Sequence, residues 1–314
     1  MSKSKRINIS SFRELLLVGV VILLCIVWTA MNSQFISMNN ITNILRQASY
    51  TAIATVGMTM VIIIGEIDLS AGSLVCASGL VGAMVCKSTD NVVLAVLAAL
   101  LTGLVVGAVN GVLCAVGRLP GFIATLASMT VLRGLAYIVT GGNSVVWSSD
   151  AFTQIGTGYV GIVPIPVIIM LVVIVFGVLL TTKLRFGRYI YAVGGNMEAS
   201  RWSGIAVVKV KVIVYMIMGV LTSIAGLIVV ARLGSGQPSA GQNFEMDCIT
   251  AAVVGGTSMS GGRGKIIGSI VGVLLLTVLT NGMTLVGINT YWQQVFKGVI
   301  IVVSVLADTR AKKS

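Results

Sequence analysis

Residues 62–73 read IIIGEIDLSAGS, and this stretch places two carboxylates inside a strongly apolar part of the chain. Glu66 and Asp68 are separated by one residue, with apolar runs on both sides of them. Charge is costly in hydrocarbon, so acids in such a place either pair with other groups or mark an ion path. The rest of the sequence indicates which kind of protein has to accommodate them.

The composition around this stretch is that of a membrane protein. Of the 314 residues, 56% are hydrophobic and only 10% are charged, and the mean hydropathy is +1.03. Soluble domains carry about 25% charged residues, and apolar runs of about 20 residues predict helical spans. We therefore expect an all-α polytopic membrane protein with about ten transmembrane helices, forming one transmembrane domain over residues 1–314. The expected spans lie near 15–31, 48–64, 71–86, 91–110, 121–140, 162–181, 210–231, 248–262, 264–283 and 288–306.

The net charge of +12 is unevenly distributed between the connections. With the N-terminus in the cytoplasm, the outer loops hold only Arg46, Lys87 and Arg232. The positive-inside rule therefore predicts that both termini are cytoplasmic, and the basic balance reflects topology rather than nucleic-acid binding. The N-terminal run resembles a signal peptide but lacks a small-residue cleavage site, so an uncleaved first span is predicted. The basic residues at the two ends are Lys3, Lys5, Arg6 and Arg13, and Arg310, Lys312 and Lys313.

Several kinds of chemistry are excluded by the residue inventory. The chain has no histidine, which removes imidazole bases, histidine metal sites and Ser-His catalysis. Its five cysteines lie in apolar segments without a C-x-x-C pair, as packed, reduced thiols do. The nearest approach to a P-loop, GGRGKI at 261–266, lacks the required glycine and Ser/Thr positions. We expect no metal, no cofactor and no ATP hydrolysis by this chain.

The opening stretch has an echo at 244–251, FEMDCITA, where Glu245 and Asp247 repeat the spacing of Glu66 and Asp68. Further landmarks follow in the same order along each half of the chain, at about 15–140 and 162–306. Five spans per half is an odd number, so the two halves must have opposite orientations, which is an inverted repeat. The paired landmarks are Asn110-Gly111 with Asn281-Gly282, and Arg133-Gly134 with Lys297-Gly298.

The segments after each E-x-D pair, near 71–86 and 248–262, are short and rich in glycine. Sixteen helical residues reach only about 24 Å, which is less than the hydrocarbon core of about 30 Å. Matched short, glycine-interrupted segments predict broken helices beside a translocation path.

Two interpretations of the acids remain open at this point. They mark a proton or cation path, or each pair precedes a helix and caps its free N–H groups at the positive end of the helix dipole. Arg133 and Lys297 lie inside spans and are possible partners for them. The candidate residues for a translocation path or a structural charge network are Glu66, Asp68, Asn110, Arg133, Glu245, Asp247, Asn281 and Lys297.

The inner connection 182–209 is basic and has a double glycine at Gly194 and Gly195. The double glycine permits a tight turn, and NMEASRW is typical of a short helix capped by Asn196. From composition alone, this segment is either a solvated positive-inside loop or a docking surface for a cytoplasmic partner.

Four stretches resemble one known family. They are MTMVIIIGEIDLSAGS, FIATLASMTVLRGLAYIVTGG, GRYIYAVGGNMEASRWSGI and ARLGSGQPSAGQNFEMDCITAAVVGGTSMSGGRGKIIGSIVG. The chain is similar, from about residue 30 to 308, to the permease subunits of bacterial ABC sugar importers of the ribose type. This resemblance implies import of ribose or a similar monosaccharide across the bacterial inner membrane.

The same resemblance implies the partners. They are a cytoplasmic ATP-binding subunit, an extracytoplasmic sugar-binding protein and a second permease copy, with a homodimer expected, surrounded by membrane lipid. It also implies that the inner loop transmits nucleotide-driven motion. The coupling residues carried over to this chain are Arg188, Gly194, Gly195, Asn196, Glu198, Ala199 and Gly204.

The chain departs from the family pattern at two places. Glu66 stands where the family usually has glycine, and Trp202 stands where an aliphatic residue is usual. Three other functions remain as alternatives. The chain could be an intramembrane enzyme, a membrane scaffold or an ion-coupled secondary transporter, whose ion site would be formed by Glu66, Asp68, Glu245 and Asp247. The missing histidine disfavours the enzyme, and the paired broken segments disfavour the scaffold.

Overall fold

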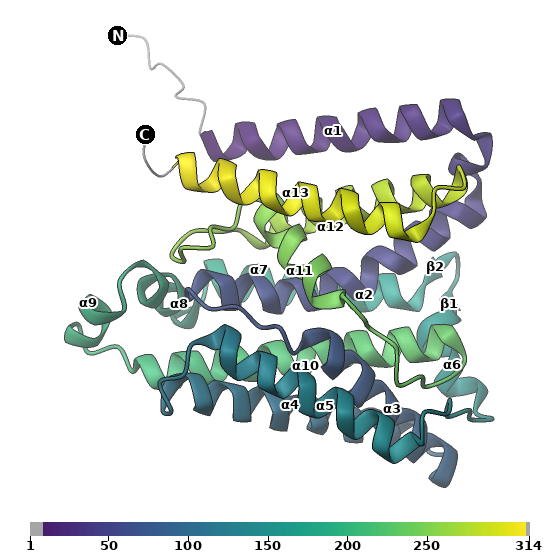
Figure 1. The fold of residues 1–314 in the computed structure, drawn as a ribbon, viewed down its shortest axis with the longest axis horizontal. Helices are drawn as coiled ribbons and strands as arrows, with labels where there is room; N and C mark the ends of the chain where they lie inside the picture. Colours follow the sequence, from purple (N-terminus) through teal and green to yellow (C-terminus); the bar gives the residue numbers. More distant parts are fainter. Residues whose placement is uncertain (1–8, 312–314) are drawn as a thin grey trace.

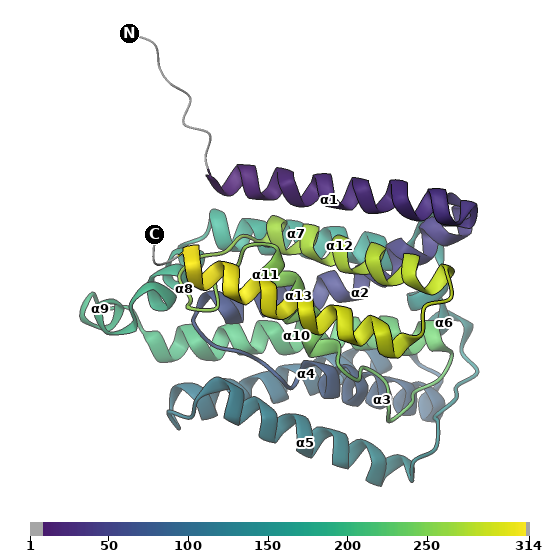
Figure 2. The same cartoon turned by 45° about the horizontal axis from the view of Figure 1, so that its top comes forward.

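The computed structural model describes residues 9–311, with side chains described for 15–306. Lys3, Lys5, Arg6, Lys312 and Lys313, which entered the topology prediction, lie outside the described residues. Figure 1 shows long helices lying side by side, with helices α8 and α9 at one end of the bundle and helix α6 with a small hairpin at the other. We call these the α9 end and the α6 end. Helix α1 begins and helix α13 ends at the α9 end, and α1 and α5 lie along opposite edges in Figure 2.

The first half of the chain contains five long helices. Helix α5 has the predicted bounds, because Pro120 precedes it and Gly141 ends it with φ +59°. Helix α2 starts earlier than predicted, because the Ser37 hydroxyl accepts a hydrogen bond from the Asn40 N–H and caps a polar first part. The elements are α1 (Ile9–Met31), η1 (Ser33–Ile36), α2 (Met38–Ile63), α3 (Ala71–Thr89), α4 (Val92–Ala115) and α5 (Gly121–Thr140).

Short elements connect the two halves. The outer connection forms α6 (Asp150–Thr157) and the antiparallel hairpin β1 (Tyr159–Val160) and β2 (Val163–Pro164). The inner connection, predicted as a loop, forms α8 (Arg185–Gly195) and α9 (Met197–Trp202) after α7 (Ile165–Thr182). Helix α9 confirms the predicted short helix, because the Asn196 side chain accepts a hydrogen bond from the Ala199 N–H at 2.9 Å.

Helix α8 and the role of the double glycine differ from the sequence prediction. Gly194 and Gly195 end α8 instead of forming a tight turn. Helix α8 buries Gly187, Ile190 and Val193 on one face, which is the periodicity of an amphipathic helix. The basic residues and glycines of this segment concealed that periodicity in the sequence.

The second half contains α10 (Val207–Leu233), α11 (Phe244–Val254), α12 (Ile266–Leu285) and α13 (Thr290–Ala311). Helix α11 is short, as predicted for this region, because Gly255 and Gly256 end it and Gly256 has φ +98°. The prediction of a short broken helix near 71–86 is wrong. Helix α3 runs unbroken for 19 residues until Asp90 takes a left-handed φ of +50°.

Among the described residues, six helices are long and apolar enough to cross a membrane: α3, α4, α5, α7, α10 and α12. Helices α1 and α13 contribute the shorter apolar stretches Leu15–Met31 and Thr290–Leu306. The chain is therefore an all-α polytopic membrane protein. The count of ten transmembrane helices stays a prediction.

Helix packing relates the two halves. Helix α10 packs against α3 and α4, and α2 packs against α11 and α12 in the same way. Helix α3 contacts α4 and α5, as α11 contacts α12 and α13. Helices α1 and α7 stand first in the two halves but pack differently. Helix α1 contacts α12, the fourth long helix of the other half, whereas α7 contacts α2, the second one. The packing is what two related halves would have, and the inverted repeat stays a prediction.

Glycines allow α4 and α10 to approach closely. Gly103, Gly107 and Gly111 recur every four residues along α4 and face α10. A Cβ atom on Gly107 would collide with the Tyr215 carbonyl oxygen and lie 2.9 Å from the Met216 Cα. Small residues at this spacing let transmembrane helix backbones touch, so this contact is a fixed part of the bundle.

Replacing Gly107 by valine should separate α4 from α10. Overpacking of this kind costs about 3 kcal/mol of folding free energy, and thermal unfolding of the purified protein in detergent would show a lower Tm. Gly19→Val in α1 is the matched control, because nothing lies within 4 Å of a Cβ added there. Equal Tm values for the two variants would contradict the close contact.

Candidate functional site

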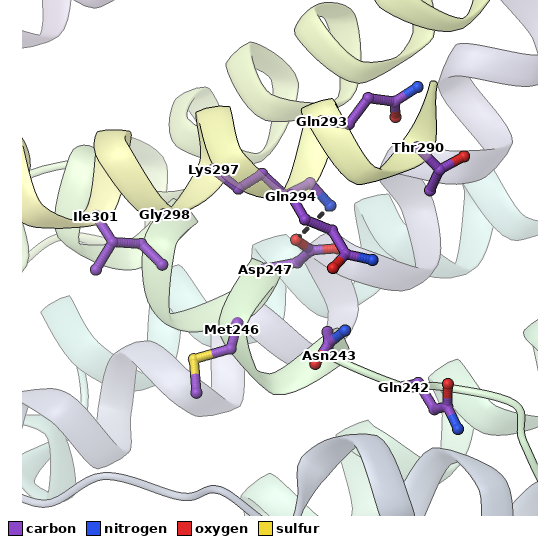
Figure 3. Close-up of a pocket in the computed structure, with 10 residues that line it drawn as sticks. All are labelled: Gln242, Asn243, Met246, Asp247, Thr290, Gln293, Gln294, Lys297, Gly298 and Ile301. Atoms are coloured by element: carbon purple, nitrogen blue, oxygen red, sulfur yellow. Dashed lines mark hydrogen bonds and ion pairs between the residues drawn. The ribbon is translucent and has the colours of Figure 1, made fainter. Parts of the chain in front are cut away.

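A cavity of about 350 Å³ lies between the N-terminal end of α11 and helix α13. Figure 3 shows polar side chains from the two elements on facing sides of this space. Helix α13 contributes residues at positions 290, 293, 294, 297, 298 and 301, which is one stripe at helical spacing. The lining residues are Gln242, Asn243, Met246, Asp247, Thr290, Gln293, Gln294, Lys297, Gly298 and Ile301.

An ion pair crosses this cavity. Lys297 Nζ lies 2.6 Å from Asp247 Oδ1, and the two side chains are 28% and 30% exposed (Figure 3). Asp247 lies in the first turn of α11, where it makes no side-chain capping hydrogen bond. The prediction that Asp247 precedes and caps its helix is therefore wrong, because α11 begins at Phe244. The expectation that Lys297 is its basic partner is confirmed.

Arg133, the corresponding basic residue of the first half, has a different role. Its Nη1 atom donates hydrogen bonds to the carbonyl oxygens of Pro238 at 2.7 Å and Ala240 at 2.8 Å. It forms no ion pair with Glu66 or Asp68 in the structure, which corrects the expectation that it would pair with them. Instead, Arg133 of α5 holds the connection that leads into α11 and the cavity.

Glu245 of α11 packs against the start of α3. It is 3% exposed, and a Cβ atom on Gly72 would collide with its carboxylate and with the Gly241 carbonyl oxygen. Gly72 is the second residue of α3, so the carboxylate meets the positive end of the α3 dipole. Glu245 lies in the first turn of α11 and thus meets the positive ends of both its own helix and α3.

Asp68 and Asn110 belong to one buried hydrogen-bond network. Asp68 Oδ1 accepts from the Ser70 N–H at 2.8 Å and from the Ser70 hydroxyl at 2.6 Å. Asn110 donates to Ser70 Oγ at 3.0 Å and accepts from the Ser128 hydroxyl at 2.5 Å. The network joins the segment before α3 to α4 and α5, so the structural interpretation of Asp68 agrees with its geometry.

Asn281, the landmark that matches Asn110, makes different contacts. Its side chain exchanges two hydrogen bonds of 2.9 Å with the side chain of Asn40. Asn40 also donates to the Phe35 carbonyl oxygen at 2.9 Å. This amide pair fastens α12 to the start of α2.

Glu66 is the centre of a second buried contact. Its Oε1 atom lies 2.5 Å from Lys211 Nζ of α10, and its Oε2 atom accepts from the Gly121 N–H at 2.9 Å. The side chains of Lys211 and Glu66 are only 8% and 13% exposed. Gly121 is the first residue of α5, so one carboxylate links α10 to the start of α5.

This contact borders a cavity of about 400 Å³ at the α9 end, between α9, the start of α10 and the connection from α4 to α5. Its charged lining residues are Glu66, Arg118, Glu198, Arg201 and Lys211. Helix α9, the Glu66–Lys211 pair and the start of α5 therefore share one space. A displacement of α9 and α10 would reach α5 through Glu66.

Most of the predicted coupling residues form a continuous exposed surface on α8 and α9. Arg188, Gly195, Asn196, Glu198, Ala199 and Gly204 are exposed, and Glu198 pairs with Arg201 at 3.1 Å. Trp202, at the end of α9, is 88% exposed. Large exposed aromatic side chains are common anchors of protein interfaces. We call these residues, with Trp202, the α8–α9 surface.

Gly194 lies beneath this surface and contacts the bundle. A Cβ atom there would collide with the carbonyl oxygen of Ile63, the last residue of α2. The Gly262 N–H donates to the same carbonyl oxygen at 2.8 Å. The Tyr191 hydroxyl donates to the Gly264 carbonyl oxygen at 2.8 Å, and burial raises the pKa of Tyr191. Helix α8 is therefore attached to α2 and to the turn before α12.

Comparisons with known proteins identify the family of the chain. A model of the protein family described as branched-chain amino acid transport system / permease component matches residues 40–305. The chain belongs to this permease family. No solved structure matches it.

Three curated relatives of the permease cover nearly the whole chain. The ribose import permease protein RbsC of Escherichia coli K12 is 45% identical over 298 residues, 94% of this chain and 92% of the relative. RbsC of Bacillus subtilis 168 is 41% identical over 314 residues, 98% and 97% of the two chains. The xylose transport system permease protein XylH of Haemophilus influenzae Rd is 34% identical over 378 aligned positions, covering both chains fully.

Sequence reasoning missed two contacts of the permease. Lys211 lies inside the apolar run VKVKVIVY, and its pairing with Glu66 was not predicted. A lysine within an apolar helix is costly unless it is paired, so its position was the available signal for a partner such as Glu66. No local signal marked Tyr191, because its acceptor is a backbone carbonyl oxygen far away in the chain.

The variant Glu66→Ala should leave the buried Lys211 ammonium without its acceptor. Removing one partner of a buried ion pair lowers the free energy of unfolding by about 3–5 kcal/mol, which thermal unfolding of the permease in detergent would detect. The double variant E66A/K211M removes both charges and should recover most of the loss.

Glu198→Ala is the control for an exposed pair, with an expected effect below about 1 kcal/mol. If the double variant were as unstable as Glu66→Ala alone, the ion pair would not be the source of the loss.

Proposed function

We propose that this permease is the transmembrane subunit of an ATP-driven ABC importer that carries ribose or a similar monosaccharide into the bacterial cytoplasm. The observation that carries the proposal is the near full-length similarity to ribose import permeases. The relatives are permease subunits rather than enzymes, so ATP is hydrolysed by a partner. The polytopic helical fold supports a location in the inner membrane.

The α9 end then faces the cytoplasm, with both termini on that side. Arg188, Arg201, Lys209 and Lys211 all lie at this end, which agrees with the positive-inside rule. At the α6 end, Arg46 donates a hydrogen bond to the Thr157 carbonyl oxygen at 2.5 Å, which explains one of the few outer basic residues.

The ATP-binding subunit docks on the α8–α9 surface, as we propose. Three features of this surface suit a protein contact. Trp202 is an exposed aromatic side chain, Glu198 and Arg201 form an exposed ion pair, and Gly195 leaves room for a side chain of the partner. The sugar-binding protein docks at the α6 end, and a second permease copy completes the pore as a homodimer. Membrane lipid covers the apolar outer faces of helices such as α4 and α13.

Transport follows from the links between these surfaces. Nucleotide-driven movement of the ATP-binding subunit displaces α8 and α9. Gly194 transmits the movement to the end of α2, and the Glu66 carboxylate transmits it from α10 to the start of α5. The pore between the two permease copies then changes the side to which it opens, which is alternating access.

The alternative is an ion-coupled secondary transporter. It would need carboxylates that exchange protons with the path, whereas each of the four acids has a partner or a tight packing contact. Asp247 and Glu66 are in ion pairs, Asp68 accepts two hydrogen bonds from Ser70, and Glu245 is packed against Gly72. This engagement supports the ATP-driven proposal.

Proteoliposomes containing the permease, its ATP-binding subunit and its sugar-binding protein should accumulate radiolabelled D-ribose only with ATP on the cytoplasmic side. A protonophore should leave the uptake unchanged, because the free energy comes from nucleotide hydrolysis. Uptake driven by a proton gradient in the absence of the ATP-binding subunit would overturn the proposal and favour the alternative.

The variant Gly195→Trp should abolish ATP-linked uptake while the permease stays folded in the membrane. Nothing lies within 4 Å of a Cβ atom at Gly195, so the indole obstructs the docking surface and not the bundle. Copurification with the ATP-binding subunit and uptake of D-ribose are the measurements.

Gly19→Trp is the matched control, since its added side chain has the same open space on α1. Full transport by the Gly195→Trp complex would contradict the assignment of the docking surface.

A further inference from the structure

We propose that the cavity between α11 and α13 is a binding site for the neutral sugar itself, so that the permease selects its substrate in addition to the sugar-binding protein. This inference rests on the proposed function and identifies a substrate-binding site in the translocation path. The chemistry and the size of the cavity support this inference.

Four primary amides line the cavity (Figure 3). Gln293 is buried and donates hydrogen bonds to the Thr284 hydroxyl and the Ile288 carbonyl oxygen. The side chains of Gln242, Asn243 and Gln294 are exposed, and within the part of the chain that the structure describes they have no hydrogen-bond partner. Each primary amide offers two N–H donors and one carbonyl acceptor. Neighbouring sugar hydroxyls donate and accept in the same way, so free amides suit a polyol.

The charges of the cavity cancel. Asp247 and Lys297 are 2.6 Å apart and leave no net charge on the lining. The Asp247 carboxylate has a second oxygen, and the Lys297 ammonium has further N–H groups, so both can also bind hydroxyls. A neutral sugar needs only these hydrogen-bonding groups and leaves the ion pair intact.

The space has the size of a small-molecule site. About 350 Å³ is within the range of ligand pockets, roughly 300–1,000 Å³. The apolar lining side chains are Met246 and Ile301, which do not form a closed pocket for a branched aliphatic side chain. The shape therefore favours a monosaccharide over a branched-chain amino acid.

The backbone holds these amides in place in an uncommon conformation. Asn243 has φ +62°, one of three non-glycine residues with positive φ among the described residues. Such conformations are uncommon for residues other than glycine and persist where the surroundings impose them. Arg133 of α5 supplies that constraint by binding the carbonyl oxygens of Pro238 and Ala240 in the preceding connection.

Helix α13 separates this stripe from the lipid. Its other face carries Val295, Val299 and Val302, all more than half exposed, as in a helix that meets lipid or a second subunit. Lys297 lies seven residues after the start of α13, about 10 Å along the helix. The polar stripe thus continues into the bundle from the α6 end, on the side where the sugar arrives.

Binding to the permease can be measured without transport. The complex of permease and ATP-binding subunit, in lipid nanodiscs without the sugar-binding protein, should bind D-ribose in saturation-transfer NMR, whereas L-leucine should not bind. Gln294→Ala and Asn243→Gly should each weaken D-ribose binding about tenfold, as expected for a lost hydrogen bond. Glycine keeps the left-handed backbone at position 243.

Gln154→Ala is the control, because Gln154 is another exposed amide at the α6 end and lies outside the cavity. Both cavity variants should keep the wild-type elution profile and ATP-binding subunit contact, which separates lost binding from lost folding.

Unchanged D-ribose binding in both cavity variants, or L-leucine binding in place of sugar, would overturn this inference. Absence of sugar binding by the wild-type complex would overturn it as well. In each case, ATP-driven D-ribose uptake by the complete importer would leave the proposed function intact. Loss of uptake by the wild-type importer would instead remove the proposed function.

Discussion

The carbonyl oxygen of Ile63 joins three parts of the molecule. It ends α2, accepts the Gly262 N–H at 2.8 Å and leaves no room for a side chain at Gly194 of α8. A backbone carbonyl cannot remain unpaired in hydrocarbon, so the chain that leaves a helix there needs a donor from elsewhere. The glycines at 194 and 262 are required for that approach, and the α8–α9 surface is attached to the bundle as a result.

The sequence indicated the membrane class, the bounds of α5 and the cap of α9, because composition, Pro120 and Asn196 act locally. It did not indicate α8, whose apolar face is interrupted by basic residues and glycines. It also missed the Glu66–Lys211 pair, because these residues are far apart in the chain and meet only after α2 and α10 have packed. A lysine inside an apolar helix indicates that some partner exists, but the sequence around it does not identify that partner.

The landmark residues of the predicted repeat make different contacts in the two halves. Lys297 binds an acid, whereas Arg133 binds backbone carbonyl oxygens; Asn281 pairs with another amide, whereas Asn110 joins a serine network. Of the two basic partners expected for the acids, Lys297 pairs with Asp247, whereas Arg133 binds backbone carbonyl oxygens instead. The partners depend on where the neighbouring helix begins, as α11 shows by starting ahead of its acids instead of after them.

Helix α2 is fastened at both of its ends. The Asn40–Asn281 amide pair holds its first turn to α12, and the Ile63 carbonyl oxygen holds its last residue to α8 and the turn before α12. Between these points its side chains are buried from Thr51 to Ile63. A helix that is held at both ends and buried between them cannot turn on its own, so α2 shifts only together with α8 and α12.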